Sequence, residues 1–169
     1  MNSANKNKLI DSVKKAILHK SFSLTGFKEK KGIFVTLKKQ GKLRGCIGFI
    51  QPIYELNKAL VEAARLAAFE DPRFPPVTSA EVKDLEVEIS ILSEPVLVKK
   101  CTEIKLDKDG LIIEQGYNKG LLLPQVFVEY KIKKIEDALA MTCEKAGLSE
   151  NAWKDKDTKI YRFEAEIIS

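Results

Sequence analysis

The chain has 169 residues, of which 44% are hydrophobic and 31% charged, and this is an ordinary globular composition with material for one substantial core. No apolar run approaches the ~20 residues needed to span a bilayer, and the start of the chain lacks the apolar stretch of a secretion signal, so we expect a cytoplasmic protein with no membrane segment. The formal charge of +5 comes mostly from lysines interleaved with 24 acidic residues, whereas nucleic-acid binding favours clustered arginines, so a nucleic-acid partner is disfavoured.

The first half of the chain begins with an amphipathic pattern and continues with a β-hairpin signal and an alanine-rich helical pattern. A tight turn at Gln40-Gly41 separates two β-branched runs, and three prolines stiffen the loop that follows the second helix. In chain order the predicted elements are a helix over 8–19, strands over 33–39 and 42–50, a helix over 53–69 and a rigid loop over 71–76.

The second half mixes short strands and helices without a regular alternation. Thr78 and Glu81 have the spacing of a capping box, which predicts the start of a short helix. The other predicted elements are strands over 85–93, 96–98, 111–116, 120–126 and 159–168, a short helix over 101–106 and a helix over 134–146. Hairpins dominate, so we predict one domain over 1–169 of the α+β class. In it, two closely packed subdomains of mostly antiparallel sheet are flanked by helices and leave a cleft between them.

The segment KLRGCIGFIQP, residues 42–52, places an arginine, two glycines and a cysteine in a strand. Strict alternation puts Arg44, Cys46 and Gly48 on one face, where the arginine would favour the thiolate form of Cys46. Gly45 and Gly48 remove side-chain bulk and permit close approach of a ligand or of another backbone segment. The pattern fits a site, and it equally fits a packed cysteine beside a β-bulge.

Three further residues are candidates for this site. Glu88 lies in a predicted strand and is either a solvated residue or a buried carboxylate that needs a cation. Arg73 is held between prolines, as an anion-binding arginine would be, and it would equally serve to fix the loop. Gln125 follows a proline at the predicted end of a strand, where it could contact a ligand or face water.

The cysteines and the histidine do not form a metal site. Cys46, Cys101 and Cys143 are far apart in the sequence and His19 is the one histidine, so we expect reduced thiols, no metal and no cofactor. The chain also has none of the short motifs that mark phosphate loops or nucleophile elbows.

Several motifs together resemble the AMMECR family, named after a human chromosomal region linked to Alport syndrome, midface hypoplasia and elliptocytosis. They are LRGCIG, the family's hallmark, with RFPP, EIS, DGLIIEQG and LLPQV, and the likeness covers roughly residues 5 to 168. The resemblance implies an α+β protein of two subdomains, with the hallmark lining the cleft. It therefore favours Arg44, Cys46, Arg73 and Glu88 as site residues, but it does not specify a reaction.

Prokaryotic members of the family are similar to one component of a three-part system that also has a Memo-like protein and a radical-SAM protein. These two proteins are therefore expected partners, and the radical-SAM cluster would belong to the partner because this chain lacks the cysteine spacing for it. Two functions stay open. In one, Cys46 and Glu88 catalyse a reaction of an anionic small molecule bound by Arg44 and Arg73. In the other, the chain is a non-catalytic module that binds a partner protein.

Overall fold

The computed structural model describes residues 1–169 and contains four α-helices, seven strands and three short 3-10 helices. All strand pairs within each unit described below are antiparallel, so the α+β class predicted from the sequence is confirmed. The chain divides into two compact units. Unit 1 comprises residues 1–92 and 166–169, and unit 2 comprises residues 93–165. No helix has the length and apolar character that crossing a bilayer requires.

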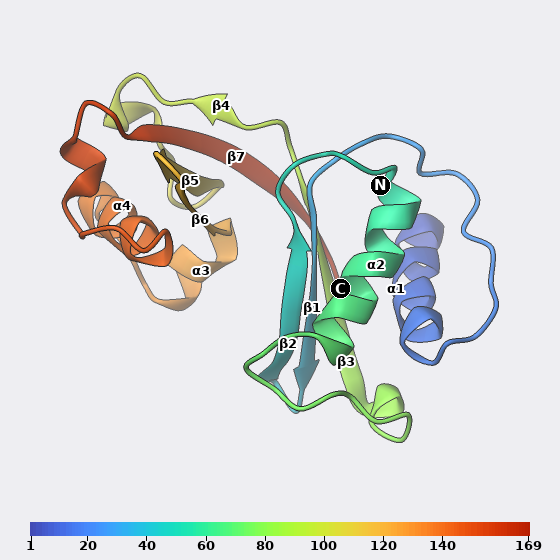
Figure 1. Cartoon of the computed structure of the whole chain (residues 1–169). Helices are drawn as coiled ribbons and strands as arrows, with labels where there is room; N and C mark the ends of the chain where they lie inside the picture. The colour runs from blue at the N-terminus through green and yellow to red at the C-terminus, as the bar shows by residue number, and fades with distance from the viewer. The chain divides into compact units, whose positions relative to one another are not determined.

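Unit 1 packs two helices on one side of a three-stranded sheet (Figure 1). Strand β1 lies in the centre and pairs with β2 on one side and β3 on the other. The elements are α1 (Ser3–Ile17), β1 (Ile33–Lys39), β2 (Lys42–Phe49), α2 (Leu56–Phe69), the 3-10 turn η1 (Val82–Asp84) and β3 (Leu85–Leu92).

The predicted hairpin of β1 and β2 is confirmed, and its turn follows from two residues. Gln40 and Gly41 have φ angles of 52° and 72°, the left-handed pair that a two-residue hairpin turn requires. The sheet then packs its apolar residues against α2. Val35, Leu37 and Ile89 have no exposed surface and belong to one core cluster with the alanines of α2.

Helix α2 begins at Leu56, later than the predicted start at residue 53. The preceding residue, Glu55, is extended and forms a β-bridge with Lys30, and the Leu56 amide donates to the Glu29 carbonyl at 2.9 Å. A β-type contact with a distant segment therefore takes the place of the first helical turn. Sequence periodicity cannot reveal such a contact, because it involves residues far apart in the chain.

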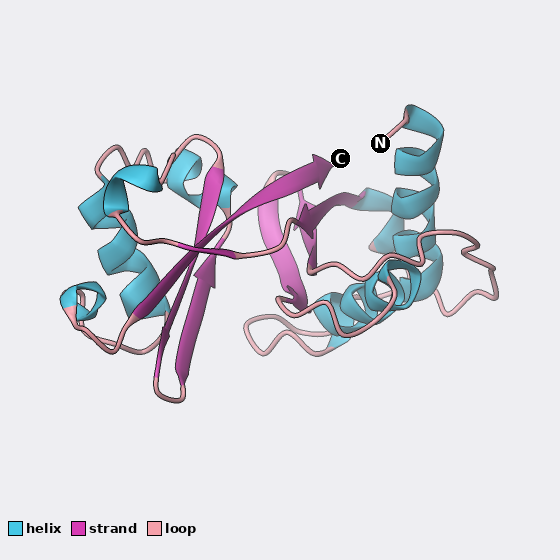
Figure 2. Cartoon of the chain, turned by 90° about the horizontal axis from the view of Figure 1, so that it is seen from above, coloured by secondary structure: helices cyan, strands magenta, loops and turns pink.

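Helices of unit 2 lie beside its antiparallel strands (Figure 2). Among these strands β5 pairs with β6 and β7, and β4 pairs with β7. The core cluster of unit 2 includes the fully buried residues Phe127, Leu139 and Cys143. The elements are β4 (Val96–Leu97), η2 (Cys101–Glu103), β5 (Asp109–Gln115), β6 (Asn118–Leu122), α3 (Pro124–Glu129), α4 (Ile135–Lys145), η3 (Ala152–Lys154) and β7 (Lys159–Ile168). The last residues of β7 belong to unit 1.

The prediction of a strand over 120–126 is wrong beyond Leu122. Pro124 occupies the first turn of α3, a position where its fixed φ suits a helix and its missing N–H costs nothing. Gln125 is consequently a helical residue and does not lie at the end of a strand.

Candidate functional site

Cysteine, threonine and glutamate side chains form a row across the three strands of unit 1. Thr36 of β1 pairs with Cys46 of β2 on one side and with Glu88 of β3 on the other. Their neighbours Leu37 and Val87 are buried in the core that includes α2. Because side chains alternate along a strand, the row occupies the sheet face that is turned away from α2.

This face, which we call the thiol face, includes Thr36, Lys38, Cys46, Glu88 and Ser90. The Sγ atom of Cys46 lies 3.2 Å from Oγ1 of Thr36, and either atom can donate the hydrogen bond. Lys38 Nζ donates to Glu88 Oε2 at 3.2 Å. Thr36 and Ser90 are buried, while Lys38, Cys46 and Glu88 are half-buried. Glu88 is therefore a paired, half-buried carboxylate, and it is less solvated than the alternating sequence pattern suggests.

The prediction that Arg44 shares a face with Cys46 is wrong, because β2 contains a β-bulge. Leu37 pairs with Gly45 and Lys38 pairs with Leu43, so Arg44 is the extra residue. Its guanidinium is bound by the segment after α2: Nε and Nη2 each lie 3.3 Å from a carboxylate oxygen of Glu81. Nη1 and Nη2 also donate to the carbonyl oxygens of Pro75 and Pro76, at 2.8 and 3.3 Å.

Asp71, which the sequence did not single out, connects this segment to the backbone of Cys46. Its carboxylate is only 2% exposed. Oδ2 accepts the Cys46 amide at 2.9 Å, and the two carboxylate oxygens accept Nε and Nη2 of Arg73 at 2.9 and 2.7 Å. These hydrogen bonds from Arg73 hold the pKa of the Asp71 carboxyl well below its usual range. Asp71 and Arg73 thus form a tight ion pair at the outer edge of β2.

The two glycines of the motif are explained by backbone contacts. A Cβ atom on Gly45 would lie 2.1 Å from the carbonyl oxygen of Ala67, so β2 and α2 could not approach as closely. A Cβ atom on Gly48 would lie 2.1 Å from the carbonyl oxygen of Ile33 in β1. The close approach expected at both glycines is therefore made by protein backbone, and a ligand role for them stays a prediction.

Burial raises the pKa of the Cys46 thiol above its ordinary value. The hydrogen bond from Thr36 and the positive charge of Arg73 act in the opposite direction, whereas the carboxylates of Asp71 and Glu88 raise the pKa further. The expected lowering of this pKa by Arg44 is thus wrong. The arginine whose charge acts on the pKa of the Cys46 thiol is Arg73.

The structure brings most of the predicted site residues together within unit 1. Cys46 and Glu88 lie on the thiol face, Arg73 lies at its edge, and Arg44 points into the loop beside it. Gln125 belongs to α3 of unit 2, so its place in this site stays a prediction. The sequence reasoning missed Thr36, Lys38 and Asp71, and of these only the Asp-Pro-Arg order of residues 71–73 gave a local signal, an aspartate two positions from an arginine.

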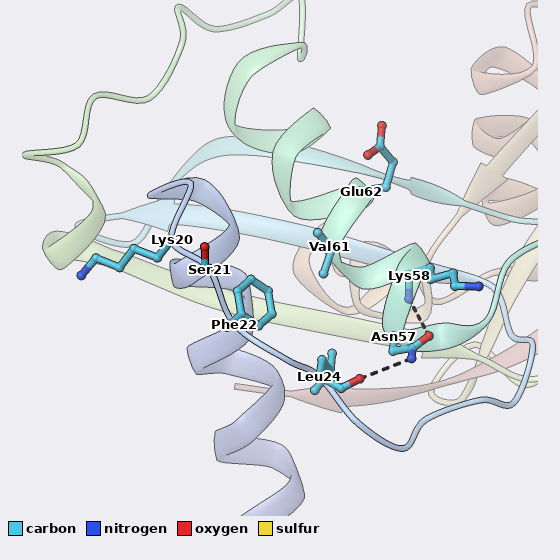
Figure 3. A pocket seen from close by; sticks show the side chains of 8 residues that line it. All are labelled: Lys20, Ser21, Phe22, Leu24, Asn57, Lys58, Val61 and Glu62. Carbon is cyan, nitrogen blue, oxygen red and sulfur yellow. Dashed lines mark hydrogen bonds between the residues drawn. The ribbon is translucent and has the colours of Figure 1, made fainter.

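A separate hollow of about 440 Å³ lies between the segment after α1 and helix α2 (Figure 3). Phe22, Leu24 and Val61 provide apolar contacts, and the side chain of Asn57 fastens the segment by donating to the Leu24 carbonyl at 3.3 Å. None of the site residues predicted from the sequence lines this hollow. It is therefore distinct from the thiol face.

Comparisons with known proteins agree with this architecture. The crystal structure of the uncharacterised protein PH0010 from Pyrococcus horikoshii superposes with a TM-score of 0.91 at 41% identity, covering 99% of this chain and 92% of that one. A protein of Thermococcus onnurineus is 51% identical over 149 residues, which are 82% of this chain and 72% of the relative. Protein MJ0810 of Methanocaldococcus jannaschii is 51% identical over 149 residues, covering 83% and 74%. The AMMECR1 family matches residues 4–168, so the chain belongs to the AMMECR1 family.

Proposed function

We propose that unit 1 binds a small molecule at the thiol face, with Cys46, Thr36 and Glu88 as the contacting groups. The observation that supports this proposal is the row itself. A thiol, a hydroxyl and a carboxylate lie on three adjacent strands, and two of these groups are only half-buried. Strands about 4.8 Å apart place such groups within reach of one small ligand.

In the catalytic form of this proposal Cys46 is the nucleophile and Glu88 accepts a proton. Burial raises the pKa of the Cys46 thiol, so a nucleophilic role needs Cys46 to lose its proton before it attacks. Arg73 is the arginine available to an anionic ligand, because the guanidinium of Arg44 is occupied by Glu81, Pro75 and Pro76. Gln125, predicted from the sequence as a ligand contact, belongs to unit 2 and stays a prediction.

The test is a thermal-shift screen of small metabolites in which every hit is measured again on Cys46→Ala and Glu88→Gln variants. A ligand present at 100 times its Kd stabilises the folded state by about 2.7 kcal/mol. We expect this stabilisation to fall in both variants and to persist in Glu144→Gln, which alters an exposed glutamate of α4. Equal stabilisation of the wild-type protein and both site variants would rule out the thiol face as the binding site.

A second candidate function is a non-catalytic module that binds a Memo-like or radical-SAM partner. Ile53 and Tyr54 are exposed on the loop before α2, and the start of α2 directly after this loop is held by the Leu56 and Asn57 amides, which donate to the carbonyls of Glu29 and Phe27. Contiguous exposed apolar residues are a feature of protein-interaction surfaces. Under this reading, substitution of Ile53 by Asp abolishes co-purification with the partner, while Cys46→Ala leaves it intact.

A further inference from the structure

We infer that the site takes small monocarboxylates and that Arg73 binds their carboxylate beside Cys46. This inference rests on the proposed function, because it names the ligand class of the same site.

Arg44, Lys38 and Arg73 border the site, and they differ in how many of their nitrogen donors are already bonded to protein groups. All three guanidinium nitrogens of Arg44 are bonded to protein groups, and its side chain is only 13% exposed. Lys38 is paired with Glu88. Arg73 is 51% exposed and donates from Nε and Nη2 to Asp71 and from Nη2 to the Cys46 carbonyl, which leaves the Nη1 edge of the guanidinium open to solvent or to a ligand.

Asp71 fixes the position of this open edge relative to Cys46. It holds Nε and Nη2 of Arg73 in a bidentate pair and accepts the backbone amide of Cys46 with the same carboxylate. Nη2 of Arg73 also lies 3.4 Å from the carbonyl oxygen of Cys46. The guanidinium is thus tied to the residue that carries the thiol, and Asp71 acts as a positioning residue for Arg73.

The balance of charges limits the kind of anion. Arg73 already has Asp71 as a counter-ion, and Lys38 already has Glu88. A multiply charged ligand such as a phosphate would bring more negative charge beside these two carboxylates than a monocarboxylate does. A single carboxylate can accept from Nη1 of Arg73, which is bonded to neither Asp71 nor Cys46.

Alkylation of Cys46 by two nearly isosteric reagents tests this inference. Iodoacetate carries a carboxylate and iodoacetamide carries a neutral amide. In both reactions the thiolate sulfur forms a bond to the CH₂ carbon, iodide leaves, and the thiol proton passes to the buffer. The rate at Cys46 is followed by peptide mass spectrometry on the native, full-length chain. The iodoacetate rate is divided by the iodoacetamide rate, and this quotient is then divided by the same quotient for N-acetylcysteine. The normalised ratio does not depend on the population of thiolate.

We expect this normalised ratio to be about tenfold in the wild-type protein, equivalent to about 1.4 kcal/mol. The iodoacetate rate should also saturate with reagent concentration. The Arg73→Gln variant should return the ratio to about one. Arg65→Gln, which alters an exposed arginine of α2, should leave the ratio as in the wild type. A ratio near one in the folded wild type, or an unchanged ratio in folded Arg73→Gln, overturns the inference.

A further measurement needs no variant and covers the case in which Arg73→Gln does not fold. Propionate should protect Cys46 of the wild-type protein from iodoacetamide, whereas propionamide should not. Equal protection by the two overturns the inference. The proposed function fails separately, if neither reagent labels Cys46 until the protein unfolds.

Discussion

At the scale of single residues, Cys46 is a thiol whose chemistry is set by burial and by four neighbours. Burial disfavours the thiolate, and the carboxylates of Asp71 and Glu88 disfavour it further, while Thr36 and Arg73 favour it. Together these effects raise the pKa of the Cys46 thiol. A nucleophilic cysteine with a depressed pKa would need an unopposed cation, and here the nearby cation, Arg73, is neutralised by Asp71.

This balance predicts opposite effects for two substitutions. In the wild-type protein the alkylation rate of Cys46 should titrate with a midpoint above that of an ordinary thiol. Thr36→Val removes the hydrogen bond that favours the thiolate, so the midpoint should rise further. Glu88→Gln removes a negative charge, so the midpoint should fall. The measurement is the pH dependence of iodoacetamide labelling at Cys46, with Cys101 in the same digest as the reference. Shifts of the same sign in both variants would contradict this account.

The residue scale also shows where sequence reasoning failed at the site. Cys46 and Glu88 were singled out because they are polar residues in apolar strands, and the structure brings them to one face, while their role in a site stays a prediction. Arg44 was misplaced because strict alternation holds only where the β1–β2 pairing is regular. Arg44 is the extra residue of a β-bulge, which changes the direction of its side chain. Asp71 was missed because its partner is the backbone of a residue 25 positions away, a contact that no local pattern encodes.

At the scale of elements, the carboxylate of Glu81 connects the segment from Asp71 to Asp84 with the β1–β2 hairpin. The carboxylate of Glu81 accepts the Thr78 amide at 2.9 Å, Lys39 Nζ at 3.1 Å and two nitrogens of Arg44. The Thr78 amide bond is the reciprocal half of the predicted capping box, although the helix that follows is only the 3-10 turn η1. These bonds lower the pKa of Glu81 to about 2, and the Thr78 amide makes the largest contribution.

Replacing Glu81 by Gln should therefore destabilise the protein in a pH-dependent manner. A carboxylate whose pKa is lower in the folded state contributes stability above its unfolded value of about 4.3, and that contribution disappears as the pH falls toward 2. We expect Glu81→Gln to cost about 1–2 kcal/mol at pH 7, with the difference shrinking between pH 4.5 and about 2. Urea unfolding at several pH values measures it, and Glu62→Gln is the control. A difference that is constant with pH would show that packing, and not charge, accounts for the effect.

Element types were easier to predict from the sequence than element limits. The hairpin, the alanine-rich helix and the final strand each have a clear period and a clear turn or cap, and all three are present. The errors lie at ends. Helix α2 starts late because Glu55 bridges to Lys30, and the strand before Pro124 gives way to α3. Glu55, whose partner is distant in the sequence, and Pro124, which lies in the first turn of a helix, are each compatible with more than one local structure.

At the scale of the whole molecule, each unit has its own apolar core. Leu60 is fully buried in the core cluster of unit 1, and Leu139 is fully buried in that of unit 2. A site confined to unit 1 then needs the core of unit 1 for its geometry. The thiol face should accordingly respond to damage in its own core and be insensitive to damage in the other, because stability in proteins is distributed among cooperative regions.

Two matched cavity variants, Leu60→Ala and Leu139→Ala, test this expectation. Each truncates a leucine with no exposed surface, so each should cost about 2–5 kcal/mol in the free energy of unfolding. Leu60→Ala should raise amide hydrogen exchange in β1 and β2 and accelerate alkylation of Cys46. Leu139→Ala should raise exchange in α4 and β5 and leave the alkylation rate of Cys46 unchanged. Equal increases in both units for both variants would mean that the chain opens as one cooperative body, so that residues of unit 2 such as Gln125 could influence Cys46 through stability alone, without touching its ligand.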